Sequence, residues 1–192
     1  MKIMDKYKII ALFGKSGAGK DTIQKWLINN ANMNGIISCT TRPPRDYEQN
    51  GIDYYFISVD EFTKKVLDYS MLEATMFNDW FYGTSIESLS LDTINIGVFN
   101  IEGIRNLIQN PQLKVIPIYV KTDDKIRLLR ILQREDNPNC HEICRRFLAD
   151  EKDFCDIDFT YSEFNNNNAT IDDAMSFFKE ITDCADILGN FN

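Results

Sequence analysis

The sequence predicts an α/β fold in which a parallel core sheet is flanked by helices. Residues 7–13 form an aliphatic run that is typical of a buried strand, and a glycine-rich turn follows it directly. Apolar residues at helical spacing come next, at residues 23–28. A length of 192 residues with 44% hydrophobic residues suits one domain of this class with small appendages.

Composition and charge narrow the class of protein. The chain holds 21 basic and 29 acidic residues, and its formal net charge of −8 argues against general nucleic-acid binding. No window approaches the roughly 18 uninterrupted apolar residues of a membrane span, and the N-terminus lacks the apolar segment of a signal peptide. The five cysteines are expected to be reduced thiols. We therefore expect a cytoplasmic protein, monomer or homodimer, with no nucleic-acid partner and no membrane partner.

The glycine-rich turn at residues 14–20 reads G-x-x-x-x-G-K. Between a strand and a helix this pattern makes a phosphate-binding loop, because its glycines let successive backbone N–H groups point into one concavity and the helix N-terminus adds partial positive charge. Lys20 would place a cation against the β- and γ-phosphates of a nucleotide. The predicted ATP-phosphate site comprises Gly14, Lys15, Ser16, Gly17, Ala18, Gly19, Lys20, Asp21 and Thr22.

Asp21 departs from this pattern, because a serine or threonine hydroxyl usually follows the lysine and reaches Mg²⁺. A carboxylate cannot donate a hydrogen bond to phosphate, although it can bind a metal through water. Thr22, one residue later, is the alternative hydroxyl and the predicted metal-binding residue.

Residues 38–56 form the second informative stretch. Pro43 and Pro44 bar a helix and restrict the directions in which Arg42 and Arg45 can point. Two such guanidinium groups suit a phosphate dianion, because each planar fork can donate two charge-assisted hydrogen bonds. Solvated loop arginines are the alternative interpretation.

Together with the phosphate loop, the pattern S-x-T-T-R-x-P-R-x-x-E-x-x-G-x-x-Y-x-F at residues 38–56 resembles the guanylate kinases. The resemblance continues through residues 59–62, 72–73 and 82–84, and it weakens toward the final helix. It implies the fold of the P-loop nucleoside monophosphate kinases, with an inserted module that binds the monophosphate and a helical lid. The implied reaction transfers the γ-phosphoryl group of ATP to GMP or dGMP, with Mg²⁺ as cofactor.

The resemblance also implies which side chains bind GMP. The phosphate is assigned to Arg42, Arg45, Tyr54 and Tyr82, and the guanine base to Ser38, Glu73 and Thr84. The chemistry of Glu73 agrees, since an ionised carboxylate can accept hydrogen bonds from N1–H and N2–H₂ of guanine, whereas adenine presents a lone pair at N1. A site built for such hydrogen bonds can reject the wrong base by about 10⁴-fold.

The family commonly carries two acidic residues where this chain has Val98 and Asn100. Asn100 can still bond the guanine edge, but neither side chain offers a carboxylate to a metal. Together with Asp21, these two residues indicate that metal binding or the rate of phosphoryl transfer differs from that of the family.

Two arginine-bearing helices joined by a polar break at residues 135–139 look like the mobile lid of nucleotide kinases. The resemblance implies that Arg134 and Arg146 bind the ATP phosphates and stabilise the transferring phosphoryl group, with Arg130 assisting. Arg145 is the alternative to Arg146. An adenine-contacting asparagine is placed at Asn168. The implied catalytic residues are Lys20, Arg42, Arg134 and Arg146.

The remaining elements follow from local patterns. Asp60 is the expected N-cap of a short helix, and Pro117 indicates an edge or a bulge in its strand. The predicted elements are a helix at 60–67, strands at 71–77, 80–82, 94–100 and 114–120, and a final helix at 171–188. We expect a single domain, 1–192, with its core at 1–33 and 93–192, a monophosphate-binding insert at 34–92 and a lid at about 131–146.

A guanylate kinase is thus the expected function, with two alternatives. The first is a non-catalytic guanylate-kinase-like scaffold, which the changes at Asp21, Val98 and Asn100 favour. The intact loop residues and lid arginines favour catalysis instead. The second is a kinase for another (deoxy)nucleoside monophosphate, against which Glu73 argues.

Overall fold

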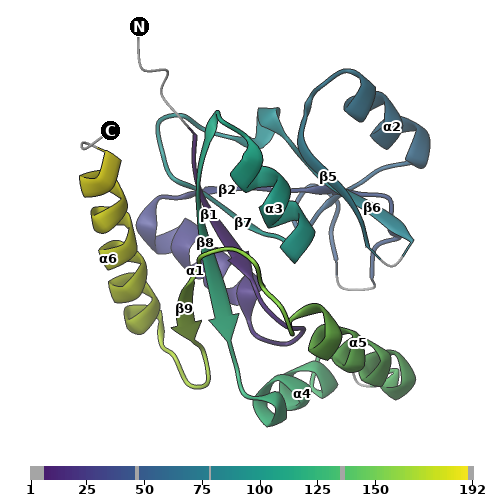
Figure 1. Ribbon diagram of the computed structural model, residues 1–192. Coiled ribbons are helices and arrows are strands. Elements are labelled where there is room, and N and C mark those ends of the chain that lie inside the picture. The colour runs from purple at the N-terminus through teal and green to yellow at the C-terminus, as the bar shows by residue number, and fades with distance from the viewer. Residues whose placement is uncertain (1–6, 46–47, 78, 135–136, 190–192) are drawn as a thin grey trace, which may run out of the picture.

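The computed structural model describes residues 7–45, 48–77, 79–134 and 137–189, and they form two sheets with helices around them (Figure 1). The larger sheet has five strands in the order β2-β7-β1-β8-β9, and every described pairing in it is parallel. Its strands are β1 (Tyr7–Phe13), β2 (Asn34–Gly35), β7 (Asn95–Val98), β8 (Leu113–Lys121) and β9 (Ser162–Asn165).

Strand β1 lies in the middle of this sheet, and its side chains alternate between two hydrophobic clusters. Ile10 and Leu12 pack with residues of α1 (Lys20–Ala31) and α6 (Ile171–Gly189). Ile9 and Phe13 point to the other face and pack with residues of α3 (Ile101–Gln109). Helices therefore cover both faces of a parallel sheet, as predicted, and the phosphate loop leaves the carboxyl end of its central strand.

The smaller sheet has four strands in the order β4-β3-β6-β5, with parallel and antiparallel pairs, and α2 (Val59–Leu67) packs beside it (Figure 1). The predicted insert started at residue 34, but Asn34 and Gly35 pair with β7 in the core sheet, so the smaller sheet begins after them. Its strands are β3 (Cys39–Thr40), β4 (Tyr55–Phe56), β5 (Met71–Phe77) and β6 (Trp80–Ser85), and a short 3-10 helix follows at Ile86–Ser88.

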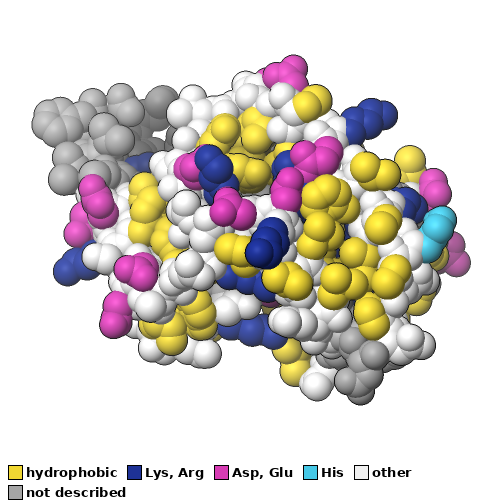
Figure 2. All heavy atoms as spheres, turned by 90° about the horizontal axis from the view of Figure 1, so that it is seen from below, with side chains coloured by type: hydrophobic (Ala, Val, Ile, Leu, Met, Phe, Trp, Pro, Cys, Tyr) yellow, Lys and Arg dark blue, Asp and Glu magenta, His cyan; other side chains and the backbone are white. Residues whose placement is uncertain are grey.

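Two further helices, α4 (Asp124–Leu132) and α5 (Cys140–Asp153), follow the carboxyl end of β8 (Figure 1). Figure 2 views the molecule from the end where these helices lie and shows hydrophobic side chains gathered between charged ones. The exposed leucines of the two helices are Leu129, Leu132 and Leu148. No helix in the described part of the chain is both long enough and apolar enough to cross a membrane.

Three local predictions were wrong or incomplete. Helix α2 begins after Ser58, not Asp60, because the Ser58 side chain accepts a hydrogen bond from the Glu61 N–H and the Glu61 carboxylate accepts one in return. Strand β8 is internal, and its pairing with β9 begins at Ile118, so Pro117 lacks a strand neighbour only on that side. Strand β9 and helix α3 were not predicted.

Candidate active site

A cavity of about 880 Å³ lies where the phosphate loop, the smaller sheet and α5 face one another. It brings together predicted site residues from segments far apart in the chain. Those that line it are Gly14, Ser16, Gly17, Gly19, Lys20, Asp21, Ser38, Arg42, Arg45, Tyr54, Glu73, Tyr82, Asn100, Arg134 and Arg146. The predicted residues that lie outside its lining are Lys15, Ala18, Thr22, Thr84, Arg130 and Asn168.

The loop itself has the conformation that its glycines permit. Gly17 has φ 79° and Gly19 has φ 93°, in the left-handed region. A Cβ on Gly17 would lie 2.5 Å from the Arg127 carbonyl oxygen, and one on Gly19 would lie 2.4 Å from Nδ2 of Asn166. Glycine is therefore required at both positions by backbone angle and by space.

Lys20 folds back over the loop, and its Nζ donates to the carbonyl oxygens of Gly14 at 2.6 Å and Lys15 at 3.2 Å. Burial lowers the pKa of this ammonium group, while the carboxylates of Asp21 and Asp150 oppose the shift. A cation with few solvent contacts at the base of a phosphate loop interacts strongly with an incoming anion.

Residues from distant parts of the chain hold the loop from outside. The Ala18 carbonyl oxygen accepts hydrogen bonds from Asn166 Nδ2 at 2.7 Å, Thr122 Oγ1 at 3.0 Å and Arg130 Nη1 at 3.4 Å. Arg130 also donates to the Asn166 carbonyl at 2.9 Å. Arg130 thus supports the loop backbone, and Asn166, not the exposed Asn168, is the asparagine that reaches the loop. Neither Thr122 nor Asn166 was predicted.

Arg42 and Arg45 both contact the carboxylate of Glu48. Arg42 Nη2 lies 2.9 Å and Arg45 Nη1 3.3 Å from Glu48 Oε1, and the Arg45 backbone N–H donates to Oε2 at 2.8 Å. The Glu48 side chain is only 6% exposed. The sequence pattern contained Glu48, but its orienting contacts were not predicted.

Aromatic rings lie beside these arginines in the cavity wall. The Arg42 guanidinium lies 5.6 Å from the ring centroid of Tyr54, and the Tyr54 and Tyr82 rings are 6.0 Å apart. Burial raises the pKa of Tyr54, so its hydroxyl stays a hydrogen-bond donor at neutral pH.

Glu73 is the buried carboxylate of the smaller sheet, with 7% of its surface exposed. Burial raises its pKa to about 7, and hydrogen bonding with Thr84 opposes the shift. Thr84 is fully buried behind Glu73, and its hydroxyl lies 3.1 Å from that of Ser38, which lines the cavity. Ser38 and Glu73 therefore form a polar pair against which a base edge can lie.

Asn100 lines the cavity, but its side chain is already engaged. Its Oδ1 accepts a hydrogen bond from the Gly103 N–H at 2.6 Å, as the N-cap of α3, and its Nδ2 donates to Thr75 Oγ1 at 3.1 Å. These contacts make Asn100 a support of the pocket wall rather than a free base-reading group.

Helix α5 and the segment after α4 contribute further arginines to the cavity. Arg146 Nη2 donates to Ser16 Oγ at 3.3 Å, whereas Arg145 is paired with Glu142 at 2.7 and 2.8 Å. Arg146, and not Arg145, therefore contacts the phosphate loop. Arg134 lines the cavity at the start of the break between the helices.

The residues present can accommodate a metal that arrives with a nucleotide. In the described ranges, no group of three carboxylate, cysteine or histidine side chains is placed to hold a metal. Mg²⁺ usually binds through one or two carboxylates together with substrate phosphates and water. Asp21 is an exposed carboxylate beside Lys20 that lines the cavity, whereas Thr22 does not line it.

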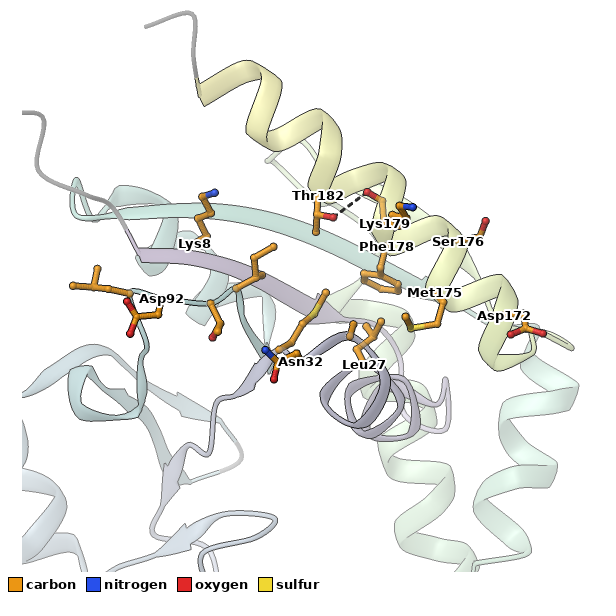
Figure 3. A pocket seen from close by; sticks show the side chains of 15 residues that line it. Lys8, Leu27, Asn32, Asp92, Asp172, Met175, Ser176, Phe178, Lys179 and Thr182 are labelled. Atoms are coloured by element: carbon orange, nitrogen blue, oxygen red, sulfur yellow. Dashed lines mark hydrogen bonds between the residues drawn. The ribbon is translucent and has the colours of Figure 1, made fainter.

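A second hollow, of about 670 Å³, lies between α1, α6 and the segment before β7 (Figure 3). Leu27, Met175 and Phe178 form part of its wall, and Lys8 and Asp92 lie toward one end of it. No predicted site residue lines this hollow.

The family model for guanylate kinase matches residues 6–184, which is nearly the whole chain. The chain belongs to the guanylate kinase family. Members of this family are ATP-dependent nucleoside monophosphate kinases, so the resemblance, the fold class and the enzyme class inferred from the sequence are confirmed.

Individual guanylate kinases agree with this assignment. The chain is 33% identical to a guanylate kinase of Campylobacter jejuni over 72% of its own length and 70% of the relative's, and 32% identical to one of Onion yellows phytoplasma over 80% and 76%. It is 45% identical to one of Malacoplasma penetrans over 86 residues, which is 44% of each chain. The crystal structure of a guanylate kinase from Anaplasma phagocytophilum shares the fold, with a TM-score of 0.67 at 17% identity, over 94% of this chain and 87% of that one.

Proposed function

We propose that this guanylate kinase family member transfers the γ-phosphoryl group of ATP to GMP or dGMP, giving ADP and GDP or dGDP. One observation carries the proposal: the phosphate loop, the Arg42–Arg45 pair and the buried Glu73 line a single cavity. Such an arrangement suits two anionic nucleotides that meet through their phosphates.

The loop end would bind ATP. Backbone N–H groups at the start of α1 and the Lys20 ammonium bind the β- and γ-phosphates, and the helix N-terminus adds to the attraction. Arg146, which already contacts Ser16, and Arg134 then neutralise charge on the phosphoryl group during transfer.

The other end would bind the monophosphate. Arg42 and Arg45, held by Glu48, bind its phosphate together with the tyrosine hydroxyls of Tyr54 and Tyr82. Ionised Glu73 accepts hydrogen bonds from N1–H and N2–H₂ of guanine, and Ser38, backed by Thr84, donates to O6. Asn100 supports the pocket wall.

The chemical step needs no protein base, because a GMP phosphate oxygen is already a nucleophile. That oxygen forms a bond to the γ-phosphorus of ATP while the bond to the β–γ bridging oxygen breaks, and ADP leaves. The side chains position the two phosphates, exclude water when lid and insert close, and stabilise the charge. Mg²⁺ bound with ATP supplies further charge neutralisation, and Asp21 is the residue that would face it.

The domain organisation proposed for this function has a core at 1–35 and 93–192, extended from 1–33 because Asn34 and Gly35 pair with β7, an insert that carries the smaller sheet between them, and a lid at about 131–146. We also propose a cytoplasmic monomer or homodimer. The free thiols of Cys39, Cys140, Cys144 and Cys155 suit a reducing compartment.

A coupled assay against a panel of nucleoside monophosphates, with Mg²⁺ and Mn²⁺ compared, tests the proposal. We expect GDP and dGDP formation with little AMP turnover, and equal turnover of AMP would refute guanine selectivity. Separate calorimetric titrations with ATP and GMP test catalysis against a scaffold role. A chain that binds GMP but neither binds ATP nor turns over any monophosphate would be a scaffold.

A further inference from the structure

The second half of α5 touches the phosphate loop through a carboxylate that the proposed mechanism does not use. The Ser16 backbone N–H donates to Asp150 Oδ2 at 2.7 Å, and the Ser16 hydroxyl lies 3.3 Å from Oδ1. Asp150 is nearly buried, with 9% of its surface exposed, and it lines the same cavity as Lys20. An acidic side chain is thus bound to a backbone N–H of a loop built to bind anions.

Asp150 is held in this position from behind by Arg127. The Arg127 side chain has no exposed surface, and its Nη1 lies 3.2 Å from Asp150 Oδ2. Its guanidinium also stacks on the Phe147 ring, 3.7 Å from the centroid, and its Nε donates to Asp124 at 2.8 Å. A buried guanidinium with fixed partners gives the carboxylate little freedom to turn away.

A second carboxylate of α5, Glu151, also connects this helix to the phosphate loop. The Glu151 carboxylate bonds both Arg127 and Lys15, with Lys15 Nζ at 2.7 Å. The network joins the cations Arg127 and Lys15 to the carboxylates of Asp124, Asp150 and Glu151. This network holds two positive and three negative charges, so it adds no net positive charge to that of Lys20 and Arg146 at the loop.

We propose that Asp150 is an intramolecular competitor for the donor nucleotide and thereby sets the affinity for ATP. Its carboxylate takes the place of a phosphate oxygen on Ser16 and repels the polyphosphate until α5 shifts. Arg146, one helical turn earlier and bonded to the same serine, is then released to meet the nucleotide. This inference rests on the proposed binding of ATP at the loop, and Asp150 acts on the affinity of that site rather than on the reacting atoms.

Calorimetric titration of ATP into the unmodified chain, Asp150→Asn and Asp150→Ala tests the inference. We expect Kd for ATP to fall about tenfold in both variants, which corresponds to about 1.4 kcal/mol. Kd for GMP should stay within about twofold, because the Arg42–Glu48 end is untouched. Asp68→Asn is the matched control: it makes the same charge change at an exposed position that ends α2, and it should leave both constants unchanged.

The outcomes separate this inference from the proposed function. If the unmodified chain binds ATP and forms GDP while ATP binding by the Asp150 variants is unchanged or weaker, the competitor role is refuted and the kinase assignment stands. If none of the chains binds ATP, both are refuted. Thermal unfolding shows whether the variants are folded. If Asp150→Ala does not fold, the ATP affinity of Asp150→Asn, which keeps the shape of the side chain, decides the test. Hydrogen exchange on the unmodified chain adds a readout, since rapid exchange of the Ser16 N–H without nucleotide would contradict the contact.

Discussion

Affinity for GMP should rise steeply between pH 6 and pH 8 because of Glu73. Its carboxyl group is nearly buried, and burial raises its pKa to about 7, with Thr84 opposing the shift. The N1–H and N2–H₂ groups of guanine are donors, so only the ionised carboxylate can accept both hydrogen bonds. Protonation of Glu73 therefore competes with GMP binding.

The size of the effect follows from this pKa. With a value of about 7, Glu73 is roughly 10% ionised at pH 6 and roughly 90% ionised at pH 8, which predicts about a tenfold gain in affinity. The GMP phosphate, with a pKa near 6, adds about twofold over the same interval. The expected total is about 20-fold.

Calorimetric titration of GMP at pH 6 and pH 8, with Glu73→Gln as the matched variant, isolates the contribution of the Glu73 carboxyl group to the pH dependence of GMP affinity. The variant leaves the titrating phosphate of GMP unchanged, so it should bind GMP more weakly overall and retain only about the twofold change. Equal pH dependence in both proteins would refute the assignment of Glu73 to the base. A change of only about twofold in the unmodified chain would refute it equally.

Four further expectations follow from the same site. The folded-state pKa of Glu73 lies above its unfolded value, so the contribution of this group to stability is fully present below about pH 4.5, and about 3 kcal/mol of it is lost as pH rises through 7; the Tm of Glu73→Gln relative to the unmodified chain should therefore increase from pH 5 to pH 8. Glu48→Gln should raise KM for GMP about tenfold with KM for ATP unchanged, because it frees the two arginines that Glu48 orients. Lys20→Met should lower kcat by about 10²–10³-fold without lowering Tm, since it removes a buried cation from the loop; an unchanged kcat would exclude Lys20 from the chemistry. Gly19→Ala should destabilise the fold by about 1–3 kcal/mol in chemical denaturation, because of its φ and the contact with Asn166.

The sequence was most informative where chemistry depends on residues close together in the chain. The phosphate loop could be interpreted because backbone conformation and spacing define its pattern locally, and residues 38–56 could be interpreted because the family resemblance is most specific there. Glu73, far from both, was assigned only through the family resemblance and the hydrogen-bonding pattern of guanine, and the structure places it in the same cavity.

The contacts that the sequence did not predict are tertiary contacts, between residues far apart in the chain. Strand β9 has a single buried side chain, Phe164, beside an asparagine run that is typical of a turn. Arg127 has the spacing of a solvated helix residue, and no local pattern reveals that it is fully buried against Asp150. The sequence showed that Asn100 replaces a carboxylate of the family with an amide. Its role as the N-cap of α3 could not be predicted, because α3 itself was not predicted.

The support of the Ala18 carbonyl has a consequence for synthesis of the chain. The Asn166 amide that holds residue 18 is 148 positions further along, and Thr122 is 104 positions further. A nascent polypeptide that has not yet reached residue 166 therefore carries the loop sequence and Thr122 without the Asn166 clamp. Such a chain should bind nucleotide poorly on the ribosome until residue 166 has been synthesised.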